Sequence, residues 1–73
     1  MTRAEWKKEV QKALIDLGKT TYGMAKDLNV TGQWIYQIMA GNGTSGVAKL
    51  WEKRISKYCG IAYPEEGFDD ESV

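Results

Sequence analysis

Residues 20–41 read TTYGMAKDLNVTGQWIYQIMAG, and this stretch decides the fold of the 73-residue chain. Apolar side chains recur through it at intervals of three or four, the spacing that covers one side of a helix. They are Met24, Ala25, Leu28, Val30, Ile35 and Ile38. Thr20 and Thr31 each suit the position before a helix begins, because a threonine hydroxyl can accept from the first free amides. The pattern predicts two short helices, over about 21–28 and 32–40, that cross over a shared core.

The connection between these two helices is predicted to be tight. Asn29 follows the first helix, and asparagine tolerates the left-handed backbone conformation that ends a helix abruptly. Val30 and Ile35 are spaced to pack across the start of the second helix, and Gly41 is placed to end it.

Two longer helices are expected on either side. Thr2 and Glu5 have the spacing of a capping box, which predicts a helix over about 3–17 that ends at Gly18. Its apolar side chains recur at helical spacing and are Trp6, Val10, Ala13, Leu14 and Leu17. A last helix is expected over about 47–58, ending at Gly60 and burying Val47, Leu50, Trp51 and Ile55. The expected fold is all-α, with four or five helices in one compact domain over residues 1–63.

Charge is distributed unevenly along the chain. Residues 1–63 hold all ten basic side chains and five acidic ones, a net charge of +5, whereas residues 64–73 hold five acidic side chains and no basic one. A basic domain suits an anionic partner. The acidic segment 64–73 is expected to be an irregular, mobile tail nearly free of core residues. It either competes with an anionic partner for the basic surface or is a passive, solubilising tail.

Several functional classes lack support in the sequence. The chain has no histidine and one cysteine, Cys59, so histidine-based catalysis, an internal disulfide, a metal site and a cofactor are not expected, nor is an enzyme. Gly41–Gly46 matches a dinucleotide-binding glycine pattern, but a helix, not a strand, is expected before it. No apolar run approaches the ~20 residues of a membrane span, and no signal peptide is visible. A free thiol and these absences favour a cytoplasmic setting.

The helix expected over 32–40 has an unusual outer face. Gln33, Tyr36, Gln37 and Ala40 share that face, and none of them is charged. Helix-turn-helix modules hold the second of two such helices in the major groove of DNA. A glutamine amide can donate and accept at once, which matches the N6 and N7 edge of adenine. The tyrosine ring can contact a thymine methyl. We therefore expect Gln33, Tyr36 and Gln37 to contact bases.

Phosphate contacts are expected around the ends of the same two helices. The candidates offer a hydroxyl, an amide or an ammonium group and are Lys19, Thr20, Thr21, Lys26, Asn42 and Thr44, with Lys49 on the last helix. Trp34 falls between the inner and outer faces. Partial burial in the core is favoured, and packing on the sugar-phosphate backbone or contact with a partner are the alternatives.

The chain resembles the lambda-repressor-like family, which includes phage Cro and repressor domains and xenobiotic-response-element type regulators. The resemblance covers about residues 6–61. It depends on Leu14, Gly18, Lys19, Thr20, Met24, Ala25, Leu28, Val30, Thr31, Ile35, Gln37, Ile38, Gly41 and the segment Ile55–Tyr58. It implies a phage or prophage transcriptional regulator that binds a palindromic DNA operator as a homodimer. It also implies that Thr31 contacts a phosphate and that Gly32, Gln33 and Gln37 lie at bases.

Departures from the family pattern support a second hypothesis. Gly32 stands where a side chain often contacts DNA, Gly23 weakens the first helix of the pair, and Ala40 and Asn29 replace a common asparagine and a turn glycine. Together with Trp34, Tyr36, the acidic segment and the zero net charge, they favour a helix-turn-helix fold that binds protein, as an inhibitor or antirepressor does.

Overall fold

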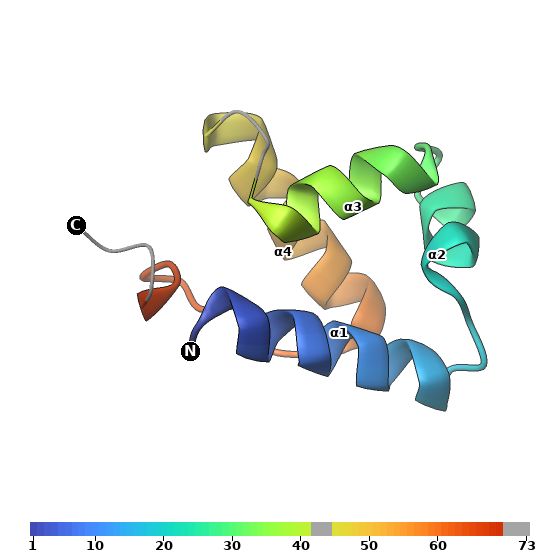
Figure 1. The fold of residues 1–73 in the computed structure, drawn as a ribbon, viewed down its shortest axis with the longest axis horizontal. Coiled ribbons are helices and arrows are strands. Elements are labelled where there is room, and N and C mark those ends of the chain that lie inside the picture. Colours follow the sequence, from blue (N-terminus) through green and yellow to red (C-terminus); the bar gives the residue numbers. More distant parts are fainter. Residues whose placement is uncertain (42–44, 70–73) are drawn as a thin grey trace.

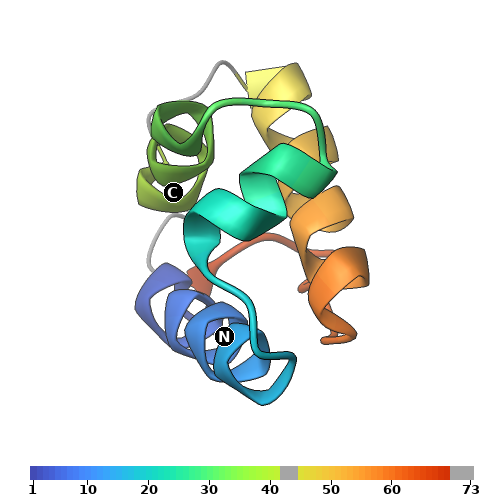
Figure 2. The same ribbon diagram turned by 90° about the vertical axis from the view of Figure 1, so that its right-hand side faces the viewer.

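The computed structural model describes residues 1–41 and 45–69, and within this part of the chain all regular structure is helical. The four helices are α1 (Arg3–Asp16), α2 (Thr21–Asp27), α3 (Gly32–Ala40) and α4 (Ser45–Cys59). In Figure 1, α1 and α3 lie on opposite sides of the molecule, α2 joins them at one end, and α4 crosses behind. Seen from the α2 end, α4 flanks both α1 and α3 (Figure 2). The predicted all-α class is confirmed.

Local capping chemistry sets the ends of the helices as predicted. Thr2 and Glu5 form both bonds of the capping box: the Glu5 amide donates to the Thr2 hydroxyl at 3.1 Å, and the Thr2 amide donates to the Glu5 carboxylate at 2.9 Å. The hydroxyls of Thr20 and Thr31 accept from amides in the first turns of α2 and α3. Asn29 adopts a φ of 62°, and the connection between α2 and α3 is as tight as expected.

The core lies where α1, α2, α3 and α4 meet. Its fully buried side chains are Trp6, Val10, Met24, Ala25, Ile35, Ile38 and Ile55. Leu14 and Met39 join them, and Leu28 packs half-buried against the cluster. The predicted packing of the apolar side chains of α2 and α3 against the core is therefore confirmed, although Leu17, which was expected on the apolar face of α1, is exposed.

The prediction for α4 was wrong in its rotation. Val47 and Leu50 were expected in the core, but Leu50 is 49% exposed and Val47 is similarly open. Ile55 is buried and Trp51 half-buried, as expected, but the other buried residues of α4 are Ala48, Glu52, Ser56 and Cys59. Two polar members of this set have partners inside the molecule: Glu52 pairs with Arg3 at 2.7 Å, and the Ser56 hydroxyl accepts from the Trp6 indole at 2.8 Å. Hydrophobicity alone assigns such side chains to the surface, because it ignores their partners.

The acidic segment also differs from its prediction. Its described part, up to Asp69, is irregular, but Phe68 is only 4% exposed and lies against Trp6 with ring centroids 5.4 Å apart. Tyr63 packs edge-on against Phe68 and donates to the Glu52 carboxylate at 2.6 Å. The Asp69 carboxylate pairs with the amino group of Met1 at 2.8 Å. The segment was expected to be irregular and nearly free of core residues; its described part is irregular, and Phe68 is the one buried core residue there, which anchors the segment to the domain.

None of the helices in the described part of the chain combines the length and apolar character needed to cross a membrane.

Replacing Phe68 tests the anchoring of the acidic segment. Phe68→Ala should lower the free energy of unfolding by about 3 kcal/mol, because it empties a buried aromatic site. Glu66→Ala, in the same segment but exposed, should change it by less than about 0.5 kcal/mol. Urea unfolding followed by tryptophan fluorescence measures both, and equal stability of the two variants would contradict the packing.

Candidate nucleic-acid interface

The outer face of α3 is a polar surface without charge. Gln33, Tyr36, Gln37 and Ala40 are all exposed, while Ile35, Ile38 and Met39 are buried on the other side of the helix. The buried residues fix the rotation of α3, so the outer residues have no alternative position in the core. The structure therefore brings together the three side chains, Gln33, Tyr36 and Gln37, that the sequence assigned to bases.

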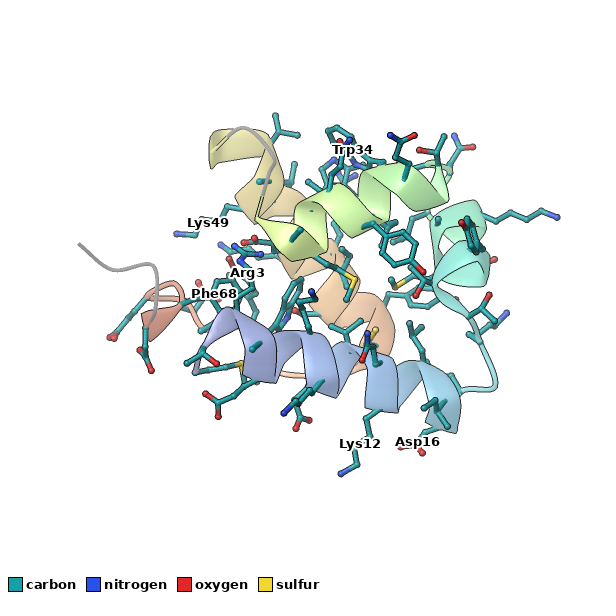
Figure 3. The ribbon with its side chains drawn as sticks, viewed as in Figure 1. Arg3, Lys12, Asp16, Trp34, Lys49 and Phe68 are labelled. Carbon is teal, nitrogen blue, oxygen red and sulfur yellow. The ribbon has the colours of Figure 1, made fainter. Side chains whose placement is uncertain are left out.

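Arg3 holds the end of this helix in place. Its guanidinium donates to the Ile38 carbonyl at 3.1 Å and to the Met39 carbonyl at 3.4 Å, while it pairs with Glu52 on α4. The guanidinium carbon also lies 4.4 Å from the centroid of the Phe68 ring (Figure 3). The last turn of α3 leaves carbonyls without partners in the helix, and Arg3 satisfies them with a charged donor. These contacts fix the C-terminal end of α3 and, with it, the orientation of the outer face of the helix.

Tyr22 lies across the start of α3 and was not predicted as a site residue. A Cβ atom on Gly32 would lie 2.3 Å from the Tyr22 ring, so only glycine admits the ring in this position. The Tyr22 ring meets the Tyr36 ring edge to face, with centroids 6.1 Å apart. The sequence signal was Gly32 itself, since a glycine directly after a helix cap is a poor helix former and calls for a reason. Gly32 has no side chain to offer a base, and its backbone is buried.

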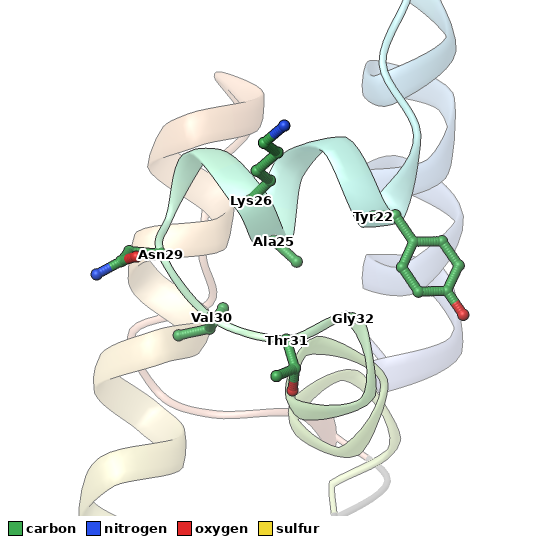
Figure 4. Close-up of a pocket in the computed structure, with 7 residues that line it drawn as sticks. All are labelled: Tyr22, Ala25, Lys26, Asn29, Val30, Thr31 and Gly32. Atoms are coloured by element: carbon green, nitrogen blue, oxygen red, sulfur yellow. The ribbon is translucent and has the colours of Figure 1, made fainter.

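A shallow hollow of about 480 Å³ adjoins Tyr22 between α2 and the start of α3 (Figure 4). Lys26, Asn29 and Thr31 provide its polar lining, and Ala25, Val30 and Gly32 complete it. Lys26 is the one basic residue between positions 20 and 41 of the sequence. Of the candidate phosphate contacts, Lys26 and Thr31 therefore both line this hollow.

Lys19 lies elsewhere. Its ammonium group is 3.5 Å from the Asp27 carboxylate, which also accepts from the Tyr58 hydroxyl at 2.5 Å. That hydrogen bond from Tyr58 is the main cause that lowers the pKa of Asp27, with Lys19 adding to it, and the same bond raises the pKa of Tyr58. Lys19 does not line the hollow that Lys26 lines; it lines a different one, together with Thr20 and Thr21.

The remaining threonines of the interface have partly engaged hydroxyls. Thr20 accepts from the Gly23 amide at 3.0 Å and Thr31 from the Trp34 amide at 3.1 Å, which leaves each hydroxyl hydrogen free to donate. Thr21 begins α2 and is half-buried. Asn42 and Thr44, the other two candidates, lie outside the described residues.

Aromatic pairs border the outer face of α3 on both sides. Tyr22 and Tyr36 lie along one edge. Along the other, Trp34 packs half-buried against Trp51 of α4, as expected for a partly buried side chain, with centroids 6.5 Å apart. Within the described residues the buried Trp34 indole nitrogen has no hydrogen-bond partner. Figure 3 shows Trp34 on the side of the molecule opposite Lys12 and Asp16 of α1.

Comparison of the chain with protein-family models, with curated proteins and with solved structures finds no match. Any assignment of function therefore depends on the sequence pattern and on the chemistry of the described side chains.

The Asp27–Tyr58 hydrogen bond should make stability depend on pH. Asp27 has a lowered pKa in the folded chain, so the unfolded chain binds its proton at higher pH. The stabilisation is therefore present above the ordinary carboxyl pKa of 3.8 and is lost as the pH falls through the lowered value. Tyr58→Phe should be less stable than the wild type at pH 7, and the difference should close in acid.

Tyr36→Phe is the matched control, because Tyr36 makes no such bond in the described part of the chain. Urea unfolding between pH 7 and pH 2.5 measures the effect. A difference between wild type and Tyr58→Phe that stays constant over this range would contradict the assigned cause.

Proposed function

We propose that the chain is a small sequence-specific DNA-binding regulator of lambda-repressor-like type, of phage or prophage origin, that inserts α3 into the major groove of an operator. The observation that carries this proposal is the uncharged, exposed face formed by Gln33, Tyr36 and Gln37 on a helix fixed at both ends. A helix face that contacts only solvent can carry charged side chains equally well, so solvent exposure does not explain why this face has none. A surface of amides and a phenol matches the donors, acceptors and methyl groups on base edges.

Each group has a defined task in this proposal. Gln33 lies in the first turn of α3, where recognition helices meet bases, and its amide can bond to N6 and N7 of adenine. Gln37 follows one turn later on the same face. Lys26 and the hydroxyls of Thr20, Thr21 and Thr31 hold phosphates and so set the position of α3 in the groove. Two copies bound as a homodimer to a palindromic site would place their α3 helices about 34 Å apart.

Catalysis is not part of the proposal. Burial raises the pKa of the Cys59 thiol to about 11, so the thiol stays protonated at neutral pH and is a poor nucleophile. Within the described residues, no three carboxylate or thiol side chains gather into a potential metal site.

Duplexes selected from a random library, titrated over a salt series, test the proposal. Lys26→Ala should weaken binding to all sequences alike and reduce the slope of log K against log salt by about 1, because one phosphate contact is lost. Lys12→Ala is the matched control, since Lys12 is exposed on α1, away from α3 (Figure 3).

Gln33→Ala should relax the preference at one base position by about 1–3 kcal/mol. Equal losses for Gln33→Ala on selected and random duplexes would contradict direct readout.

A second candidate function, protein binding, is favoured by the outer face of α4. Val47 and Leu50 are about half exposed beside Trp51, and the Arg54 guanidinium lies 4.9 Å from the centroid of the Trp51 ring. Adjacent exposed apolar side chains on one helix face are typical of interaction sites. A chain that acts as an inhibitor or antirepressor would use this face.

Photo-crosslinking in cells of the native host tests the second candidate. A photoreactive residue in place of Leu50 should yield one discrete protein adduct. The same residue in place of Ile15, an apolar side chain that is 76% exposed on α1, should yield none. Identical adduct patterns from the two positions would rule out a specific partner at α4.

A further inference from the structure

Tyr22 occupies a position that packing does not explain. Its side chain is 66% exposed, so the ring contributes little to the core. The chain nevertheless places glycine at the first position of α3, where glycine is a poorer helix former than alanine, and only glycine admits the ring. The Tyr22 ring thus covers a backbone position that a larger residue would block, while most of the ring surface stays open to a ligand.

The geometry of the pair restricts what that ligand can be. Tyr22 and Tyr36 stand at an interplanar angle of 74°, so a flat base cannot be sandwiched between parallel rings. Tyr36 is 51% exposed, and neither phenol makes a hydrogen bond within the described residues. What the two rings present together is a small apolar surface on the side of α3 where Gln33 is also exposed. It suits a compact apolar group on a surface that is otherwise polar.

We propose that Tyr22 and Tyr36 form a contact site for thymine C5-methyl groups next to the base that Gln33 reads. This inference deepens the proposed function and rests on it. In the major groove, the thymine methyl is the one apolar group that a base pair presents. Gln33 follows Gly32, which Tyr22 covers, and Tyr36 lies one turn further along α3 on the same exposed face as Gln33. An amide that favours adenine and an apolar site that favours thymine together specify neighbouring A·T pairs.

The test replaces thymine by uracil, which removes the methyl group and leaves the hydrogen-bonding edge intact. Duplexes selected with the full chain are resynthesised with dU at each thymine in turn. Wild type should bind about fourfold more weakly when the contacted methyl is removed, from the burial of one methyl-sized group. Tyr36→Ala and Tyr22→Ala should bind the dT and dU duplexes equally. Tyr22→Phe and Tyr36→Phe keep the rings and should keep the fourfold preference.

Two further variants separate the site from general binding. Lys26→Ala should weaken binding to dT and dU duplexes alike and leave their ratio unchanged. Gly32→Ala should displace the Tyr22 ring and reduce the ratio, although both tyrosines remain. Circular dichroism verifies that each variant is folded, which is expected because both rings are largely exposed.

The outcomes distinguish this inference from the function on which it rests. Salt-dependent binding to selected duplexes, with no effect of dU at any position, would overturn the methyl site and leave DNA binding intact. A dU effect that persists unchanged in Tyr22→Ala and Tyr36→Ala would assign the methyl contact to another side chain and would also overturn the site. No binding to duplex DNA at any salt concentration would overturn both the inference and the proposed function.

Discussion

The buried ion pair between Arg3 and Glu52 is the interaction on which the arrangement of the helices depends. Both side chains are largely removed from water, and their charged atoms approach to 2.7 Å. Taking two charges out of water is costly, and the cost is offset only if the remaining donors and acceptors also find partners. They do so here: Arg3 donates to the last carbonyls of α3, and Glu52 accepts from Tyr63 in the segment after α4. One pair thus connects α1, α3, α4 and the C-terminal segment, and loss of either partner would leave a buried charge uncompensated.

This pair also explains which features of the fold could be predicted from the sequence. The capping box at Thr2, the caps at Thr20 and Thr31 and the turn at Asn29 are local, because each joins residues only a few positions apart. The bounds of α3 were predicted correctly for the same reason. The rotation of α4 was not, since it depends on a partner 49 residues away that turns Glu52 inward and leaves Leu50 outside. Phe68 was missed because the acidic composition of its segment concealed one aromatic anchor.

The candidate interface also combines features that the sequence predicted with features that depend on contacts between helices. Helical periodicity alone placed Gln33, Tyr36 and Gln37 on one exposed face, as the structure has them. Periodicity within one helix could not reveal Tyr22, which reaches that face from α2, nor could it show that Lys19 is drawn toward Asp27. Tertiary contacts thus change the chemistry of the surface from a row of amides with several lysines to a row of amides beside an aromatic pair. Lys26 is the one basic residue between positions 20 and 41, so the proposed DNA binding would draw few phosphate contacts from this stretch and would depend more on its base contacts.

The two candidate surfaces are physically distinct although they share a border. The outer face of α3 extends from the Tyr22–Tyr36 pair to Trp34, and the outer face of α4 begins on the far side of the Trp34–Trp51 contact. Gln33 and Gln37 belong only to the first face, and Val47 and Leu50 only to the second. A protein bound along α4 would therefore not occupy the side chains proposed to read DNA.

Such a protein would, however, contact the tryptophan pair that supports one edge of α3. The indole nitrogen of Trp34 on α3 is buried without a hydrogen-bond partner in the described residues. This edge of α3 therefore lacks a hydrogen bond that would stabilise it. The C-terminal end of α3, in contrast, is held by Arg3. The two proposed binding modes would therefore use different side chains, and the tryptophan contact is where one would influence the other.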